Sequence, residues 1–156
     1  MGTVHNRRLL RIGWERYDRL IEILARKLRR KPQVRYGTIA GVPSGGLVPA
    51  VSLSHRLGGE CVTADLGRQD VDIVVDDILD SGLTYRQVFG GKGHVKRAPV
   101  YFAVLCIKRS QLRRYSNTIH ATVVEDDVWV VFPWEGKSGK RVRQDISAYL
   151  NKVKGE

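Results

Sequence analysis

The sequence predicts an α/β fold in which a mainly parallel, twisted sheet is flanked by helices. Two observations favour this class. First, the segments 71–75 and 100–108 are apolar at nearly every position, which is typical of strands buried on both faces of a parallel sheet. Second, segments with apolar residues every three or four positions alternate with these strands, as in sheets whose strands are joined by helical crossovers.

The expected elements alternate regularly along the chain. An amphipathic helix covers 13–31, with its apolar residues three or four positions apart, and ends before Pro32. A buried strand over 36–42 leads through the turn 43–46 into a second helix, which ends at Gly58. The later elements are expected as strands at 60–64 and 71–77, a helix at 84–89, strands at 100–108, 118–126 and 128–135, and a helix at 142–153.

Length and composition indicate one domain, residues 1–156, which is large enough to form a stable core without disulfide bonds or a structural metal. Cys61 and Cys106 stand in apolar segments without metal-ligand spacing, which indicates buried thiols in a reducing compartment. No signal peptide and no apolar run near ~18 residues is visible, so a cytoplasmic protein that does not span a membrane is expected. Lys and Arg exceed Asp and Glu by 27 − 16 = 11 charges, which favours a phosphorylated substrate or nucleic acid as partner.

Three acids stand where the most apolar strand meets a turn. Asp76 and Asp77 follow the apolar run, Asp80 comes next, and the turn 81–84 reads Ser-Gly-Leu-Thr. A glycine turn before a helix presents converging N–H groups that suit a phosphate. Adjacent carboxylates repel unless something holds them, and a sugar phosphate offers vicinal hydroxyls and Mg²⁺. The alternative is an ordinary helix cap, with Asp80 as a capping acid.

The segment VVDDILDSGLT resembles the signature of type I phosphoribosyltransferases. Three further segments resemble the pyrophosphate loop, lysine-bearing strand and base-binding segment of bacterial xanthine-guanine phosphoribosyltransferases, in the same order: TIAGVPSGGLVPAVSLSHRLG, FAVLCIK and DVWVVFPWE. The resemblance covers most of 36–135 and implies the family's fold with a small base-binding hood. It also implies a purine-salvage enzyme that uses Mg²⁺ and phosphoribosyl pyrophosphate (PRPP), transfers ribose 5-phosphate to a purine base, and releases pyrophosphate and a nucleoside monophosphate.

The resemblance implies roles for the acids and the two glycine turns. Asp76 and Asp77 match the acids that hold the ribose hydroxyls and Mg²⁺, and Glu135 matches an acid near the pyrophosphate metal. Asp80 matches the general base at the purine N7, a role typically worth ~10²–10⁴-fold in rate. The 5-phosphate loop matches Asp80, Ser81, Gly82, Leu83 and Thr84.

The second glycine turn, Ser44-Gly45-Gly46, matches the pyrophosphate loop. Exposed N–H groups and the following helix suit this anion. The resemblance implies a cis peptide bond between Ser44 and Gly45. Ser44 stands where the most similar bacterial enzymes carry an arginine, so the backbone and Mg²⁺ are expected to hold pyrophosphate in place of that side chain.

On the base side, the resemblance makes Lys108 the donor to the oxygen at purine C6, which selects 6-oxopurines such as hypoxanthine, guanine and xanthine. Trp129 matches the residue that stacks on the base, and Val130 would offer its backbone carbonyl and N–H to the C2 side. The alternatives are a strand-end lysine that reaches solvent and a tryptophan that packs in an apolar strand. Trp134 fits a place in the core as well as one in the base-binding segment.

The segment 65–70 is the clearest departure from the family, because it is too short for the long flexible loop that usually closes over PRPP. The sequence leaves open what replaces that loop, which purine is preferred, and whether the implied homo-oligomer is a dimer or a tetramer. Two other functions also stay open. One is a regulatory or RNA-binding protein on the same fold, favoured by the net charge, and the other is a transferase with a different nucleobase acceptor.

Overall fold

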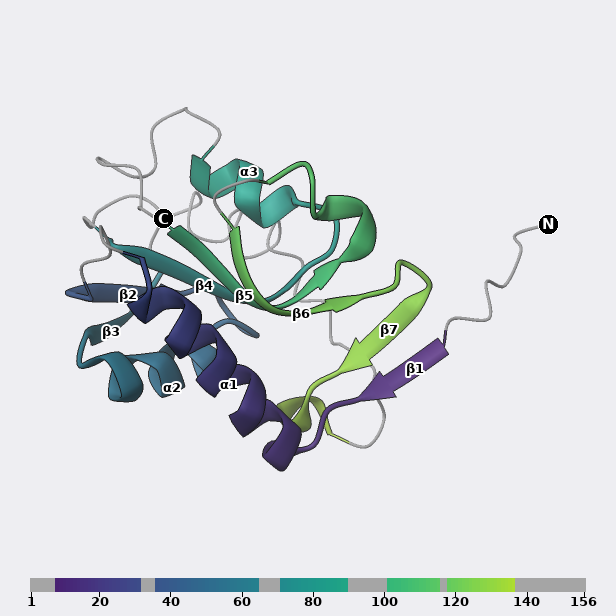
Figure 1. Ribbon diagram of the computed structural model, residues 1–156, viewed down its shortest axis with the longest axis horizontal. Helices are drawn as coiled ribbons and strands as arrows, with labels where there is room; N and C mark the ends of the chain where they lie inside the picture. The colour runs from purple at the N-terminus through teal and green to yellow at the C-terminus, as the bar shows by residue number, and fades with distance from the viewer. Residues whose placement is uncertain (1–7, 32–35, 65–70, 90–100, 116–117, 137–156) are drawn as a thin grey trace, which may run out of the picture.

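The computed structural model describes residues 8–31, 36–64, 71–89, 101–115 and 118–136. Five strands form one parallel sheet in the order β3-β2-β4-β5-β6, and helices cover both of its faces (Figure 1). This arrangement confirms the predicted α/β class. The strands are β2 (Thr38–Gly41), β3 (Glu60–Thr63), β4 (Ile73–Leu79), β5 (Tyr101–Lys108) and β6 (Thr118–Val124).

Helices α1 (Trp14–Arg29) and α2 (Leu47–Leu57) pack on one face of the sheet, and α3 (Leu83–Phe89) packs on the other (Figure 1). The predicted end of α2 at Gly58 is confirmed, since this glycine has the left-handed φ of 79°. The expected helix at 142–153 and the short segment 65–70 lie outside the described residues. Within the described part of the chain, none of the helices combines the length and apolarity needed to cross a bilayer.

Strand β4 differs from its predicted range, 71–77, because it runs from Ile73 to Leu79. Its pairing with β5 continues to the end, where Leu79 faces Ile107. The acids Asp76 and Asp77 therefore lie inside the strand and are buried, with 8% and 5% of their surfaces exposed. The sequence made them the last two residues of the strand because carboxylates usually mark a strand's end, but pairing with β5 extends the strand by two residues.

A second, two-stranded parallel sheet projects from the main sheet (Figure 1). It joins β1 (Arg8–Arg11) to β7 (Val128–Val131), and we call this pair the hood. Strand β1 was not predicted, because four residues with an arginine at each end carry no strand pattern and their partner lies far along the chain. The strand expected at 128–135 is shorter, since Pro133 cannot donate to a ladder and begins the 3₁₀ turn Pro133–Glu135.

Candidate active site

The acid pair is held inside β4 by the backbone. The N–H of Asp77 donates to Asp76 Oδ1 at 2.8 Å, so one carboxylate accepts a hydrogen bond from the residue that follows it. Both residues make further interactions. Asp80 lies just beyond the strand and is exposed to solvent. The three acids are therefore divided between two buried carboxylates and one at the surface.

The glycine turn after β2 packs directly against β4. Val42 N–H donates to the Val75 carbonyl at 2.8 Å, and Gly46 N–H donates back to the Val42 carbonyl at 2.8 Å. A Cβ atom on Gly46 would lie 2.3 Å from the Val75 carbonyl oxygen, and one on Gly45 would lie 2.2 Å from Asp77 Oδ2. Both glycines are thus required for close approach. The structure brings the predicted pyrophosphate loop into contact with the predicted ribose site.

The cis peptide bond of this turn lies one residue earlier than predicted. It joins Pro43 to Ser44, where the sequence predicts a cis bond between Ser44 and Gly45. The turn closes through the hydrogen bond from Gly46 to Val42, and the cis bond lies at the middle of that segment.

The turn after β4 packs against the side chain of Tyr115. Gly82 has a left-handed φ of 75°, and a Cβ atom there would lie 1.9 Å from the Tyr115 hydroxyl. The Arg86 guanidinium donates to that hydroxyl at 3.0 Å and to the Ser81 carbonyl at 3.2 Å. Leu83 N–H donates to Ser81 Oγ at 3.3 Å, so this serine also caps α3. The glycine was predicted, but no sequence signal pointed to Tyr115 or Arg86.

Lys108 does not reach solvent, which rules out the simple strand-end alternative. Only 5% of its surface is exposed. Its ammonium donates to main-chain carbonyls of the turn between β6 and β7, at 3.2 Å for Glu125 and 3.4 Å for Asp126, and it also donates to the Val128 carbonyl. A buried charge needs hydrogen-bonding partners, and here the partners are carbonyls of the turn between β6 and β7.

Trp129 and Val130 use the hood differently. Trp129 is half-buried, pairs in register with exposed Leu9, and belongs to neither of the two buried apolar clusters among the described residues. The Val130 side chain is buried in the core beneath the hood. The Val131 carbonyl accepts from the N–H of Ile12, the residue after β1, and peptide groups alternate between the edges of a strand. The Val130 backbone is therefore directed to the edge away from β1, the edge at which Val128 meets Lys108.

Trp134 and Glu135 take structural positions in the described part of the chain. The Trp134 ring stacks on Phe132 with centroids 4.9 Å apart and meets Tyr17 edge-on at 5.5 Å, so it packs against the core. Glu135 Oε2 accepts a hydrogen bond from Phe132 N–H at 2.7 Å. Among the described residues, no three His, Cys, Asp or Glu side chains form a group that could hold a metal, so Asp76, Asp77 and Glu135 are not brought together as one.

Cys106 lies next to the acid pair but is inert. Its thiol is fully buried, and burial followed by the charge of Asp77 raises its pKa to about 12. A thiol with this pKa stays neutral and packs as a small apolar group, as the sequence predicts. Cys61 is half-buried, and both cysteines are free.

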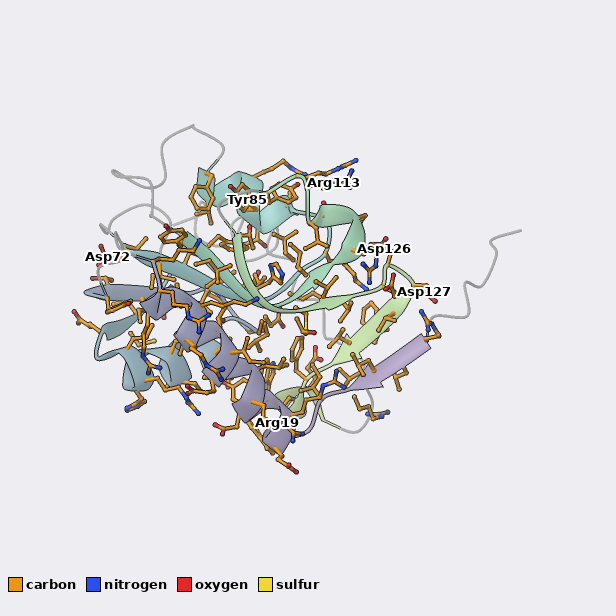
Figure 2. All side chains as sticks on the ribbon, viewed as in Figure 1. Arg19, Asp72, Tyr85, Arg113, Asp126 and Asp127 are labelled. Atoms are coloured by element: carbon orange, nitrogen blue, oxygen red, sulfur yellow. The ribbon has the colours of Figure 1, made fainter. Side chains whose placement is uncertain are left out.

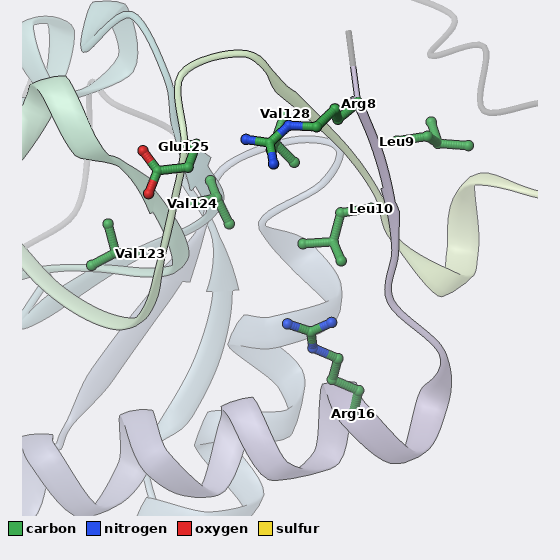
Figure 3. A pocket seen from close by; sticks show the side chains of 8 residues that line it. All are labelled: Arg8, Leu9, Leu10, Arg16, Val123, Val124, Glu125 and Val128. Atoms are coloured by element: carbon green, nitrogen blue, oxygen red, sulfur yellow. The ribbon is translucent and has the colours of Figure 1, made fainter.

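A pocket of about 340 Å³ lies between the hood, the end of β6 and the first turn of α1 (Figure 3). The Arg16 guanidinium points into it from α1, and no ion pair of Arg16 is found in the described part of the protein (Figure 3). None of the predicted base contacts lines it. The lining residues are Arg8, Leu9, Leu10, Arg16, Val123, Val124, Glu125 and Val128.

Comparison with known proteins decides the family. No family model matches the chain. A solved purine phosphoribosyltransferase from Pyrococcus horikoshii is 30% identical with a TM-score of 0.61, and the alignment covers 83% of this chain and 95% of that one. The chain belongs to the type I phosphoribosyltransferase family.

Other family members are similar over most of their length. A xanthine-guanine phosphoribosyltransferase from Idiomarina loihiensis is 28% identical over 84% of this chain and 89% of its own. The enzyme of the same name from Gluconobacter oxydans is 25% identical over 80% of this chain and 83% of its own. The resemblance predicted from the four sequence segments is thereby confirmed.

Proposed function

We propose that the protein is a Mg²⁺-dependent purine phosphoribosyltransferase that transfers ribose 5-phosphate from PRPP to a 6-oxopurine and releases pyrophosphate. The observation that carries this proposal is the contact between Gly45 and the Asp77 carboxylate. It places an N–H-rich turn beside a buried acid pair, and the second glycine turn, 81–84, follows the same strand. A phosphorylated sugar with a diphosphate on its first carbon matches these three features, and family membership supports the choice.

The two glycine turns bind the ends of PRPP. The backbone N–H groups of Ser81, Gly82, Leu83 and Thr84 surround the 5-phosphate, with the start of α3 adding its dipole. The turn 44–46 binds the diphosphate through the N–H groups of Ser44 and Gly45 and the start of α2, while the Gly46 N–H stays bonded to Val42. Asp76 and Asp77 accept hydrogen bonds from the ribose hydroxyls. The sugar is thereby held from two sides while its first carbon changes partner.

The acid pair also suits Mg²⁺. This ion prefers oxygen ligands and is commonly bound through one or two carboxylates together with substrate phosphates. Among the described residues no third His, Cys, Asp or Glu side chain joins these two buried carboxylates in a group, which suits a metal that is completed by the diphosphate of PRPP. Held by Asp76 and Asp77, the ion would supply positive charge beside the leaving pyrophosphate. Glu135 is occupied with Phe132 N–H, so its place near the metal is the least supported of the three.

The base lies between the hood and the end of β5. Trp129 stacks on its face, the Val130 backbone meets the C2 side, and Lys108 donates to the oxygen at C6. Adenine carries an amino group at C6. That group and the Lys108 ammonium are both donors, so they form no hydrogen bond with each other. Asp80 accepts the proton from N7 as the other imidazole nitrogen, N9, bonds to the ribosyl carbon and the bond to pyrophosphate breaks, and its negative charge stabilises the cationic sugar in the transition state.

The test is a panel of guanine, hypoxanthine, xanthine and adenine, each incubated with PRPP and Mg²⁺ and analysed for nucleotide by chromatography. We expect nucleotide from 6-oxopurines and discrimination against adenine of about 10⁴-fold, the size seen where a buried polar group loses its partner. Failure of all four bases would refute the transferase. Adenine as the preferred substrate would refute the assigned base contacts and keep the transferase.

The large positive charge is the observation that favours nucleic-acid binding as a second function. Several described arginines are already paired with acids, including Arg8, Arg56 and Arg109, which weakens that alternative. We expect RNA affinity in 0.15 M salt to be low, and a log–log salt slope showing several phosphate contacts would reverse this view. The family resemblance also leads us to expect a dimer or tetramer, which light scattering measures directly.

A further inference from the structure

The turn between β6 and β7 is tied to the rest of the protein at every residue. Three consecutive acids form it, and each binds a different side chain. Asp126 and Asp127 are labelled on this turn in Figure 2. The contacts are Glu125 with Arg109 (2.6 Å), Asp126 with Ser110 Oγ (2.7 Å) and Asp127 with Arg8 (2.8 Å).

The same turn is held from inside by Lys108, through the carbonyls of Glu125, Asp126 and Val128. An ammonium has three N–H donors, so three carbonyls can use all of them. When the ammonium is removed, each of the three carbonyls loses its donor. Hydrogen bonds to a charged group are costly to lose. The residues 108–110 at the end of β5 thus hold both the backbone and the side chains of the turn.

The turn determines where the base contacts lie. Trp129 and Val130 follow Val128 directly, and β7 pairs only with β1 among the described strands. A two-stranded ribbon with four residues in each strand is marginal by itself. Its position relative to the main sheet must come from contacts outside the ribbon. Val130 packs into the core beneath it, and the contacts with 108–110 fix the end nearest Trp129.

We propose that Lys108 is a positioning residue, whose ammonium fixes the turn 125–128 and thereby places Trp129 and Val130 for the base. This inference rests on the proposed function and adds to it. The oxygen of a 6-oxopurine replaces one carbonyl on the ammonium, and the Asp126 carbonyl, the longest contact at 3.4 Å, is the one exchanged. Base binding and hood position are then coupled through one side chain.

A lysine that is only a donor to the base makes a different prediction. Its removal would change the choice between oxo and amino purines and leave the free protein's hood as it is. A positioning lysine, in contrast, controls the hood before any substrate binds. Amide hydrogen exchange of the protein without substrate separates the two, because it reports local opening of backbone hydrogen bonds.

The decisive variant is Lys108→Met, which keeps the aliphatic stem and removes the ammonium. We expect amide exchange in 128–131 and 10–12 to become at least about tenfold faster, the loss typical of hydrogen bonds to a charged group, with α2 unchanged as internal reference. Lys27→Met is the matched control, since the Lys27 ammonium also donates to a β6 carbonyl, that of His120 at 2.7 Å, at a distance from the turn. The control should leave exchange of the hood unchanged.

A second variant keeps the test decisive if Lys108→Met does not fold. Arg109→Gln with Ser110→Ala removes two exposed contacts of the turn and retains the ammonium. We expect faster hood exchange and a several-fold higher KM for hypoxanthine, about 3- to 10-fold, with the discrimination against adenine retained. The inference would be overturned if the hood of this variant, and of Lys108→Met if it folds, exchanged its amides at the wild-type rate.

The positioning role of Lys108 and the transferase function are tested by separate measurements. Hood exchange is measured without PRPP or base, so an unchanged hood refutes the positioning role and leaves the transferase in place. A protein that forms no nucleotide from any base refutes the proposed function, whatever the exchange of the hood.

Discussion

The two sides of the candidate site are positioned by different means. On the phosphate side, backbone contacts so close that only glycine fits hold the turns: Gly46 against Val75 and Gly82 against Tyr115. On the hood side, charged and polar side chains at the surface hold the turn of a small ribbon, and two buried residues, Lys108 and Val130, connect it to the interior. The first arrangement leaves no room for a side chain at these glycines, whereas the second includes exposed ion pairs and hydrogen bonds.

This difference suits the two ligands. PRPP keeps its phosphates and ribose in one place, so a rigid cradle costs nothing during the reaction. A base must enter before transfer and a nucleotide must leave after it, so contacts that open locally are useful there. The comparison predicts that substitutions on the phosphate side affect turnover and global stability, and that substitutions in the hood affect base affinity.

The largest expected effect is on turnover at Asp80. Because this carboxylate is exposed, Asp80→Asn should leave the melting temperature nearly unchanged, while kcat falls by about 10²–10⁴-fold if the group is the general base. Asp18→Asn is the control, an equal change on the outer face of α1 with no expected effect on kcat. Steady-state kinetics with saturating PRPP measure both, and an Asp80→Asn enzyme with full turnover would remove the assigned role.

Next comes the stability of the phosphate-side turn. Gly82→Ala combines a left-handed φ with overlap against Tyr115, so the free energy of unfolding should fall by about 2–4 kcal/mol. Gly58 has nearly the same φ, 79°, but nothing lies within 4 Å of its added Cβ, so Gly58→Ala should cost only about 1 kcal/mol. Urea denaturation gives both values. Equal losses would mean that close packing does not define this turn.

A smaller effect is expected at the hood. Trp129→Ala should raise the KM for the base by about 5- to 150-fold, equivalent to ~1–3 kcal/mol of stacking, with the PRPP KM little changed. Leu9→Ala removes apolar surface from the cross-strand neighbour of Trp129 without removing a ring, and serves as control. If both variants raise the base KM equally, the tryptophan supports the hood by packing and does not stack on a base.

The smallest effect is a dependence of the hood on pH. Hydrogen bonds from Arg109, Ser110 and Arg8 lower the pKa values of the three turn acids, 125–127, below their ordinary range. Groups with a lowered pKa in the folded state stabilise it above their unfolded pKa, and this stabilisation is lost as the pH falls through the folded pKa. Exchange of 128–131, corrected for its intrinsic pH dependence, should accelerate relative to α2 below about pH 4. A constant ratio would show that these exposed pairs contribute nothing to the hood.

The sequence was informative where the chain itself encodes geometry. Alternating apolar segments predict the sheet and its covering helices, and glycines at 45, 46 and 82 mark the turns, because no other residue fits those backbones. It was least informative about contacts between distant segments. Strand β1 is stabilised by β7, more than a hundred residues away, and Tyr115 behind Gly82 has no local pattern. The extension of β4 beyond Asp77 to Leu79 likewise depends on pairing with β5, which the propensities of single residues do not predict.

The most direct test of the central claim is a calorimetric titration of the protein with PRPP in the presence of Mg²⁺, repeated with guanosine monophosphate. The account predicts saturable one-to-one binding of both ligands, weakened in Asp76→Asn, because the acid pair and the two glycine turns form one site for a sugar phosphate. Absence of binding for both ligands to the wild-type protein, with magnesium supplied, would contradict it.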